Sequence, residues 1–147
     1  METQVWHAML GVHGAVFSRL NRAMSREFGI TLAKFDVLAQ LYRNPAGMTQ
    51  GNLSRQLKVT GGNVTGLVRR LCGDGLITRH MSPDDRRAFV VQLTVLGKET
   101  YLSARARHDA KLEEMFREID VDDKARVLGI LLAMAARVQP SSGAAGH

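Results

Sequence analysis

Residues Thr49–Leu93 have the sequence TQGNLSRQLKVTGGNVTGLVRRLCGDGLITRHMSPDDRRAFVVQL. The pattern predicts two short helices joined by a tight turn and followed by a basic hairpin. We expect the second helix to begin at Thr60, whose hydroxyl can cap free backbone N–H groups. Its apolar residues recur at steps of three and four: Val64, Leu67, Val68 and Leu71. One side of this helix is therefore predicted to pack into a core.

The other side of this helix is predicted to face outward. It carries Asn63, Thr65, Gly66, Arg69 and Arg70. Amide, hydroxyl and guanidinium groups match base edges and phosphates, and a helix anchored by its apolar side fits the major groove of DNA. The segment is therefore predicted to bind DNA.

The charge of the chain also favours a polyanionic partner. Its 147 residues include 20 Lys or Arg against 14 Asp or Glu, a formal net charge of +6. Seven Lys or Arg and only three Asp lie from Arg55 to Arg87, so most of the excess positive charge falls in the segment predicted to bind DNA. Nucleic acid is the first candidate partner, and an anionic membrane surface is the second.

Two longer helices are predicted ahead of this segment. Apolar residues follow a helical spacing through Gln4–Phe28, and Gly29 suits the end of that helix. Thr31 suits the cap of the next helix, which is apolar around much of its surface and should be buried before it ends at Asn44. Thr49 is expected to cap the first of the two short helices.

The hairpin is predicted from two alternating segments, Leu76–Met81 and Phe89–Leu93, with turn-forming residues between them. Its tip carries Arg86 and Arg87. So short a strand pair is marginal alone and should lean on the preceding helices. The expected fold is therefore mainly α with a small β-hairpin wing, a winged helix-turn-helix.

Helices are also predicted after the wing, over Lys98–Ile119 and from Asp122 to Val138. Together with the N-terminal helix they carry more apolar surface than the central module can cover, so we expect a homodimer formed by both ends of the chain. The predicted organisation places dimerisation helices at residues 1–30 and 96–139, a DNA-binding lobe at 31–95 and a flexible tail at 140–147.

The sequence offers little for catalysis. Its five histidines are dispersed, and it has no HExxH, CxxC, nucleophile elbow or P-loop. We therefore expect no enzyme activity, no metal site and no cofactor.

The sequence also indicates a cellular location. The N-terminus resembles neither a signal peptide nor a transit peptide, and no segment has the apolar length that spans a bilayer. The lone Cys72 fits a reducing compartment, so we expect a cytoplasmic location.

Two segments resemble the MarR (multiple antibiotic resistance) family of winged-helix transcriptional regulators: LSRQLKVTGGNVTGLVRRLCGDGLITR and DDRRAFVVQLTVLGKE. The first matches the family's helix-turn-helix and the LxxxGL[IV]xR step that follows it. The second matches its wing and the opening of its next helix. The resemblance covers nearly the whole chain. It implies a homodimer that binds a pseudo-palindromic operator in double-stranded DNA, usually as a repressor released by a small ligand.

The family's Asp-x-Arg wing signature falls on Asp85, Arg86 and Arg87. The resemblance implies that Arg87 enters the minor groove, whose narrow A·T stretches concentrate negative potential, while Asp85 holds that arginine extended. Arg86 is expected to meet a phosphate. A hairpin tip that is merely solvated is the competing interpretation.

The recognition helix departs from the family. Gly61, Gly62 and Gly66 stand where relatives often carry Pro, Ser and Arg, and glycine costs about 1 kcal/mol relative to alanine inside a helix. Asn63 remains to pair with adenine and Thr65 to touch a thymine methyl, although Asn63 would also serve as a plain helix-start residue.

Phosphate contacts are expected from Arg69 and Arg70 and, on the preceding helix and turn, from Arg55, Gln56 and Lys58. The whole predicted DNA-binding set is Arg55, Lys58, Thr60, Gly62, Asn63, Thr65, Gly66, Arg69, Arg70, Asp85, Arg86 and Arg87.

A ligand pocket is implied by the resemblance, between the dimerisation helices and the DNA-binding lobe. On the first helix Trp6, His13 and Phe17 share a face, with Arg19 and Arg22 on its flank. An aromatic wall beside a cation suits an aromatic carboxylate or its acyl thioester, such as an acyl-CoA. Against this stands the simpler interpretation that these side chains only pack in the core or the dimer interface.

The small number of base-reading side chains also fits a different function, that of a low-specificity architectural or protein-tethering winged-helix protein. Oxidant sensing is a further possibility, because some relatives sense oxidants through a cysteine. That cysteine lies in their N-terminal helical region, however. Cys72 ends an apolar stripe, and we expect it to be a small buried hydrophobic residue.

Overall fold

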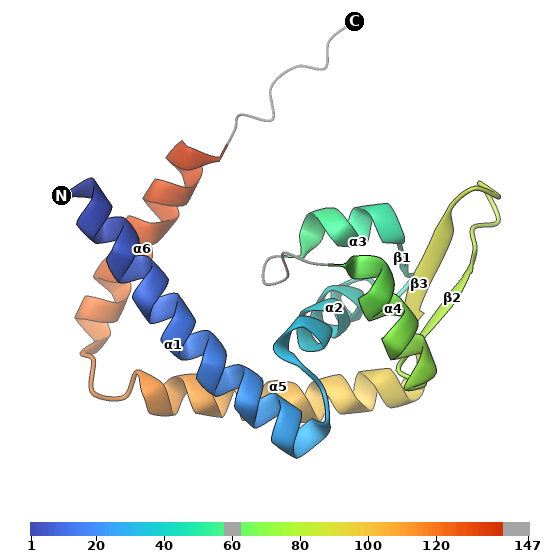
Figure 1. Cartoon of the computed structure of the whole chain (residues 1–147), viewed down its shortest axis with the longest axis horizontal. Coiled ribbons are helices and arrows are strands. Elements are labelled where there is room, and N and C mark those ends of the chain that lie inside the picture. Colours follow the sequence, from blue (N-terminus) through green and yellow to red (C-terminus); the bar gives the residue numbers. More distant parts are fainter. Residues whose placement is uncertain (58–62, 140–147) are drawn as a thin grey trace, which may run out of the picture. The chain divides into compact units, whose positions relative to one another are not determined.

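The computed structural model describes residues 1–57 and 63–139 (Figure 1). The described elements follow in the order α1 (Glu2–Phe28), α2 (Leu32–Arg43), β1 (Met48–Thr49), α3 (Gln50–Gln56), α4 (Val64–Gly73), β2 (Ile77–Met81), β3 (Phe89–Leu93), α5 (Val95–Met115) and α6 (Val121–Val138). The three strands form one antiparallel sheet in the order β1-β3-β2. The chain divides into two compact units, Met1–Leu112 and the segment from Glu113 onward. The mainly helical fold with a small wing is confirmed.

The predicted boundary between the first two helices is confirmed in detail. Gly29 ends α1 in the left-handed region with φ of 65° and bonds back to the carbonyl of Ser25. The Thr31 hydroxyl caps α2 by accepting from the backbone N–H of Lys34 at 3.2 Å. In addition, the Asn21 side chain accepts from the backbone N–H of Leu32 at 2.9 Å. The start of α2 is therefore hydrogen-bonded to α1.

Helix α2 forms the centre of the core, as its broad apolar surface predicted. Val37, Leu38 and Leu41 are fully buried on it. Other elements of the first unit contribute the buried residues Leu53, Leu67, Val68, Leu71, Val91, Tyr101 and Ala104. The short helices α3 and α4 are thus held by their apolar faces, which leaves their other faces available for contacts.

The wing contains a strand that the sequence did not predict. Strand β1 is only two residues long, and it pairs Met48 with Val91 and Thr49 with Val90. Its approach depends on Gly47, whose φ is 94° and where an added Cβ would lie 2.7 Å from Cγ1 of Val90. The predicted hairpin is present, with β2 and β3 in register from Ile77 opposite Leu93 to Met81 opposite Phe89.

The turn after α4 is hydrogen-bonded to the start of α5. Thr94 Oγ1 donates to the carbonyl of Gly75 at 2.7 Å and accepts from the N–H of Gly97 at 2.9 Å, while the Thr94 N–H donates to the carbonyl of Leu76 at 3.1 Å. Gly97 packs so closely on Leu76 that a Cβ there would lie 1.9 Å from the Leu76 carbonyl oxygen. This contact fixes α5 against the end of α4.

Both ends of α5 differ from prediction. Helix α5 begins at Val95 rather than at Lys98, because Thr94 supplies the cap, and it ends at Met115 rather than at Ile119. In the second unit α6 begins at Val121, where Asp120 Oδ1 accepts from the N–H of Asp122 at 2.8 Å. In the described part of the chain, no helix combines the length and the hydropathy required to cross a membrane.

Large apolar side chains are exposed at both ends of the chain. On α1 they are Val5, Trp6, Met9, Leu10 and Val12. On α6 they are Val121, Val127, Leu128, Ile130, Leu131, Leu132 and Val138, and no residue of α6 is buried. Exposed apolar faces of this extent are typical of protein–protein interfaces.

Candidate nucleic-acid interface

The recognition helix α4 begins later than predicted. Its N-cap is Asn63, whose Oδ1 accepts from the backbone N–H of Gly66 at 2.9 Å, and its first residue is Val64. The predicted start at Thr60 is therefore wrong. The physical reason is that the Asn63 side chain accepts from a free N–H of the first turn and so caps the helix at this point. Thr60, Lys58 and Gly62 lie outside the described residues.

Helix α4 has the predicted two-sided character with one exception. Leu67, Val68 and Leu71 are buried, and the exposed residues on the other side are Asn63, Thr65, Arg69 and Arg70. Gly66 was expected on the exposed side but is buried. A Cβ on Gly66 would lie 3.0 Å from Asn63 Nδ2 and 3.3 Å from Arg70 Nη2. Both donor groups therefore border the space above Gly66.

The start of helix α3 contacts α4 through polar side chains. Gln50 Nε2 donates to Thr65 Oγ1 at 2.9 Å, so one of the predicted base-reading residues is held by a residue of α3. Arg55 is exposed near the other end of α3, where its guanidinium donates to the side-chain oxygen of Asn52. The sequence pattern assigned no role to Gln50.

The wing tip presents Arg86 and Arg87, both exposed. Asp85 Oδ1 accepts from the backbone N–H of Arg87 at 2.9 Å, and the Asp85 carbonyl accepts from the N–H of Ala88 at 3.0 Å. Asp85 therefore shapes the turn backbone from which the Arg87 side chain extends.

A further arginine belongs to the wing and was not predicted to have a role. The Arg79 guanidinium carbon lies 3.7 Å from the centroid of the Phe89 ring, a cation–π contact. Arg79 is paired with Val91 and Phe89 with Met81, so the two residues are diagonal neighbours on one face of the hairpin. The register of the predicted strands would have indicated this pair.

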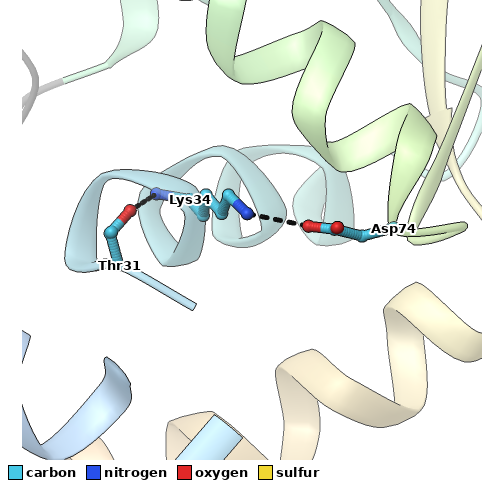
Figure 2. A network of polar contacts seen from close by, with 3 residues as sticks. All are labelled: Thr31, Lys34 and Asp74. Atoms are coloured by element: carbon cyan, nitrogen blue, oxygen red, sulfur yellow. Dashed lines mark hydrogen bonds and ion pairs between the residues drawn. The ribbon is translucent and has the colours of Figure 1, made fainter. Parts of the chain in front are cut away.

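The C-terminal end of α4 is held by an ion pair with α2 (Figure 2). Lys34 Nζ lies 2.7 Å from Oδ2 of Asp74, the C-cap residue of α4. Figure 2 shows the Lys34 side chain extending from α2 toward Asp74, while its backbone N–H is bonded to Thr31. Both ends of α4 are thus fixed by polar contacts.

The candidate ligand residues all lie on α1. The rings of His13 and Phe17 are 5.9 Å apart, Trp6 is 56% exposed, and Arg19 and Arg22 are exposed. None of them lines the cavity of about 420 Å³ between the end of α2 and the start of α5. That cavity is lined by Leu41, Tyr42, Pro45, Leu93, Thr94, Val95 and Lys98.

Cys72 was predicted to be buried but is only half-buried near the end of α4. Burial raises the pKa of its thiol above the ordinary value, and the positive charge of Arg79 offsets part of that rise. A thiol with a raised pKa holds little thiolate at neutral pH, and thiolate is the reactive form.

Among residues 1–57 and 63–139 no group of three or more His, Cys, Asp or Glu is placed to hold a metal ion.

Comparisons with known proteins agree with this geometry. Residues 28–88 match the family model described as MarR family. The transcriptional activatory protein BadR of Rhodopseudomonas palustris is 31% identical over 130 residues, which cover 86% of this chain and 74% of BadR. A MarR family transcriptional regulator from Silicibacter pomeroyi is 39% identical in a solved structure, with a TM-score of 0.84 and coverage of 94% of this chain and 95% of that chain.

Two more distant solved structures share the fold. Sco3205 of Streptomyces coelicolor, a MarR family regulator solved in complex with DNA, is 22% identical with a TM-score of 0.84, covering 97% of this chain and 90% of its own. The organohalide-sensing regulator RdhR-CbdbA1625, solved with 2,4-dichlorophenol bound, is 20% identical with a TM-score of 0.84, covering 96% of this chain and 83% of its own. The family match over the winged helix, together with relatives similar over most of both chains, shows that this chain belongs to the MarR family of transcriptional regulators.

Proposed function

We propose that this transcriptional regulator binds a specific pseudo-palindromic operator as a homodimer. The observation that carries the proposal is the exposed face of α4, where Asn63, Thr65 and Arg70 present polar groups. The first turn of α4 is bonded to α3 through Gln50 and Thr65, and its C-cap is bonded to α2 through Asp74 and Lys34. A helix held in this way can place its polar side chains opposite particular base edges. Non-specific attraction to phosphates would need only positive charge. The structure of Sco3205 in complex with DNA supports DNA as the ligand of this fold.

The contacts divide by chemistry. Asn63 and Thr65, in the first turn of α4, are assigned to base edges, because the start of a recognition helix points into the groove. Phosphate contacts are assigned to Arg69, Arg70 and Arg55 and, by their positions in the sequence, to Gln56 and Lys58. Arg87 at the wing tip is assigned to the minor groove and Arg86 to a phosphate.

The dimer is supported by the exposed apolar side chains of α1 and α6. Burying them against a second copy would remove apolar surface from water and place two α4 helices on one duplex. We assign residues 1–30 and 96–139 to this interface and residues 31–95 to DNA binding.

We propose repression that a small ligand releases. The ligand is assigned to the face of α1 that carries Trp6, His13 and Phe17, with Arg19 and Arg22 as cationic partners for an aromatic carboxylate or its acyl thioester. A shift of α1 reaches α4 through two polar contacts: Asn21 bonds the first residue of α2, and Lys34 of α2 pairs with Asp74 of α4. RdhR-CbdbA1625 with bound 2,4-dichlorophenol supports an aromatic effector on this fold.

The first experiment measures specificity. The protein selects a duplex from a random pool, and its affinity for that duplex is compared with its affinity for scrambled duplex at the same salt concentration. We expect a preference of about a thousandfold or more and half-sites about one helical turn apart. Equal affinity for both duplexes would favour the low-specificity architectural or tethering function instead.

The second experiment measures the sign of regulation and the ligand. Transcription in vitro from a promoter that carries the selected duplex should fall when protein is added; a rise would make the protein an activator, as the name of BadR states for that relative. Aromatic acids and their thioesters should raise the melting temperature of the wild type but not of Phe17→Ala. Met81→Ala, which shortens an exposed apolar side chain on β2, outside the assigned ligand and dimer residues, should keep the shift. No shift with any aromatic compound would remove the ligand assignment.

A further inference from the structure

The side-chain amide of Gln50 connects α3 to α4, but only one of its two polar atoms has a hydrogen-bond partner in the described part of the chain. Its Nε2 donates to Thr65 Oγ1 at 2.9 Å, whereas its Oε1 is buried and has no hydrogen-bond partner in the described part of the chain. We infer that Gln50 is a positioning residue for sequence specificity: it fixes the Thr65 hydroxyl as a hydrogen-bond donor that reads an acceptor atom on a base edge. This inference rests on the proposed binding of DNA by α4.

The direction of the hydrogen bond decides what Thr65 can read. A threonine hydroxyl has one proton and two lone pairs, and the Gln50 N–H occupies one lone pair. The hydroxyl proton is then left to be donated outward. In the major groove the acceptors are purine N7, guanine O6 and thymine O4, whereas the amino groups of cytosine and adenine are donors. Thr65 is thereby biased toward acceptor positions.

The buried Oε1 argues against a purely structural role for Gln50. A buried acceptor without a partner costs stability, and an apolar side chain of the same length would fill the same space without that cost. Methionine meets this description. If Gln50 served packing alone, replacing it by methionine would improve the protein in every respect.

The backbone of Gln50 is held by the wing. Thr49, its neighbour, pairs with Val90 of β3 and caps α3 by accepting from the N–H of Asn52. The Gln50 side chain therefore extends from a point that the sheet fixes and reaches α4 fifteen residues later. The hydrogen bond therefore fixes the position of the Thr65 hydroxyl with respect to the wing as well as to its own helix.

The test uses the full-length protein and the duplex that the wild type selects from a random pool. We expect Gln50→Met to leave the melting temperature unchanged or higher, and to lower the ratio of specific to non-specific affinity about fivefold to tenfold, the effect of one hydrogen bond. Thr78→Met, which places the same side chain at an exposed position of β2 to which no DNA contact is assigned, should keep the wild-type ratio. A Gln50→Met protein with the wild-type ratio, or one whose ratio falls together with its melting temperature, would overturn the inference.

Two further variants test the link to Thr65 and the direction of the bond. Thr65→Val should lower the ratio to the same extent as Gln50→Met, and the double variant should lower it no further; additive losses would overturn the inference. The carboxylate of Gln50→Glu can only accept a hydrogen bond, so the Thr65 hydroxyl should donate to it and no longer to the base. The ratio should then fall at least as much as in Gln50→Met, and a wild-type ratio in Gln50→Glu would show that the assigned direction of the hydrogen bond is wrong. A wild type that prefers no duplex would instead remove the proposed function, before any variant is compared.

Discussion

Lys34 Nζ lies 2.7 Å from Asp74 Oδ2, and this pair joins the first turn of α2 to the C-cap of the recognition helix. The Lys34 side chain is 14% exposed and that of Asp74 is 46% exposed, so the pair is partly shielded from water. The start of α2 is also hydrogen-bonded to Asn21 of α1, so polar contacts connect α1 with α4 through α2. Contacts of this kind can transmit a change at α1 to the DNA-binding surface without altering any residue that touches DNA.

We expect Lys34 and Asp74 to be energetically coupled. In a double-mutant cycle of Lys34→Met and Asp74→Asn, the coupling free energy should be about 1 kcal/mol at low salt, because a partly shielded pair exceeds a typical surface ion pair. Screening should reduce it in high salt. Urea unfolding of the four proteins at two salt concentrations measures this. Strictly additive effects would show that the pair does not support α4.

Gly97 should tolerate no side chain. Gly97→Ala places a Cβ 1.9 Å from the Leu76 carbonyl oxygen, a backbone atom that Thr94 also binds, so the chain must move. We expect a loss of about 2–4 kcal/mol in the free energy of unfolding. Gly73→Ala is the matched control, since nothing lies within 4 Å of its added Cβ and alanine favours the helix. Thermal unfolding of the two variants should move in opposite directions.

The helix caps were predictable because they are local. Thr31 and Thr49 each cap a helix by bonding an N–H three residues ahead, and Gly29 needs only its own backbone freedom to end α1. The burial of α2 was predictable for a similar reason, since its apolar residues surround the helix. A linear pattern contains the information for such features.

Contacts between distant residues were not predictable. Strand β1 is too short to show a period, and its partner β3 lies some forty residues later in the chain. The pair of Lys34 and Asp74 spans forty residues, and the bond of Gln50 to Thr65 spans fifteen. No spacing rule connects such positions before the fold has brought them together. The late start of α4 was missed because Thr60 and Asn63 are both good caps, and only the geometry selects Asn63.

Asn63 should serve folding and DNA binding separately. Asn63→Asp keeps a capping oxygen and places an acid at a helix N-terminus, so the free energy of unfolding should stay within about 0.5 kcal/mol of the wild type. Its DNA affinity should fall, because the carboxylate lacks a donor and is repelled by phosphates. Asn63→Ala should lose about 1 kcal/mol of stability as well as affinity. If Asn63→Asp binds the selected duplex like the wild type, Asn63 is only a cap.

Arg87 and Arg86 should differ although they are adjacent at the wing tip. Arg87→Ala should weaken binding to the selected duplex by about 1–3 kcal/mol, with most of the loss confined to duplexes that carry A·T pairs under the wing. Arg86→Ala should weaken specific and scrambled duplexes alike and reduce the salt dependence. Dimerisation should be unchanged in both, as sedimentation would show. Equal behaviour of the two variants would contradict the minor-groove assignment.

Cys72 should behave as a protected residue and not as an oxidant sensor. Because burial raises the pKa of its thiol above the ordinary value of 9.0, alkylation of the folded protein at pH 7–8 should be slower than alkylation in urea. The sign of the pH effect follows: above pH 9.0 the unfolded thiol ionises first, so the stability that Cys72 contributes is complete below that pH and is lost as the pH rises through the higher folded value. Cys72→Ser should reduce that loss, which thermal unfolding between pH 8 and 10.5 measures. Release from the selected duplex should be unaffected by peroxide in both proteins, and a peroxide response present in the wild type and absent in Cys72→Ser would show that the half-buried thiol is accessible to oxidants.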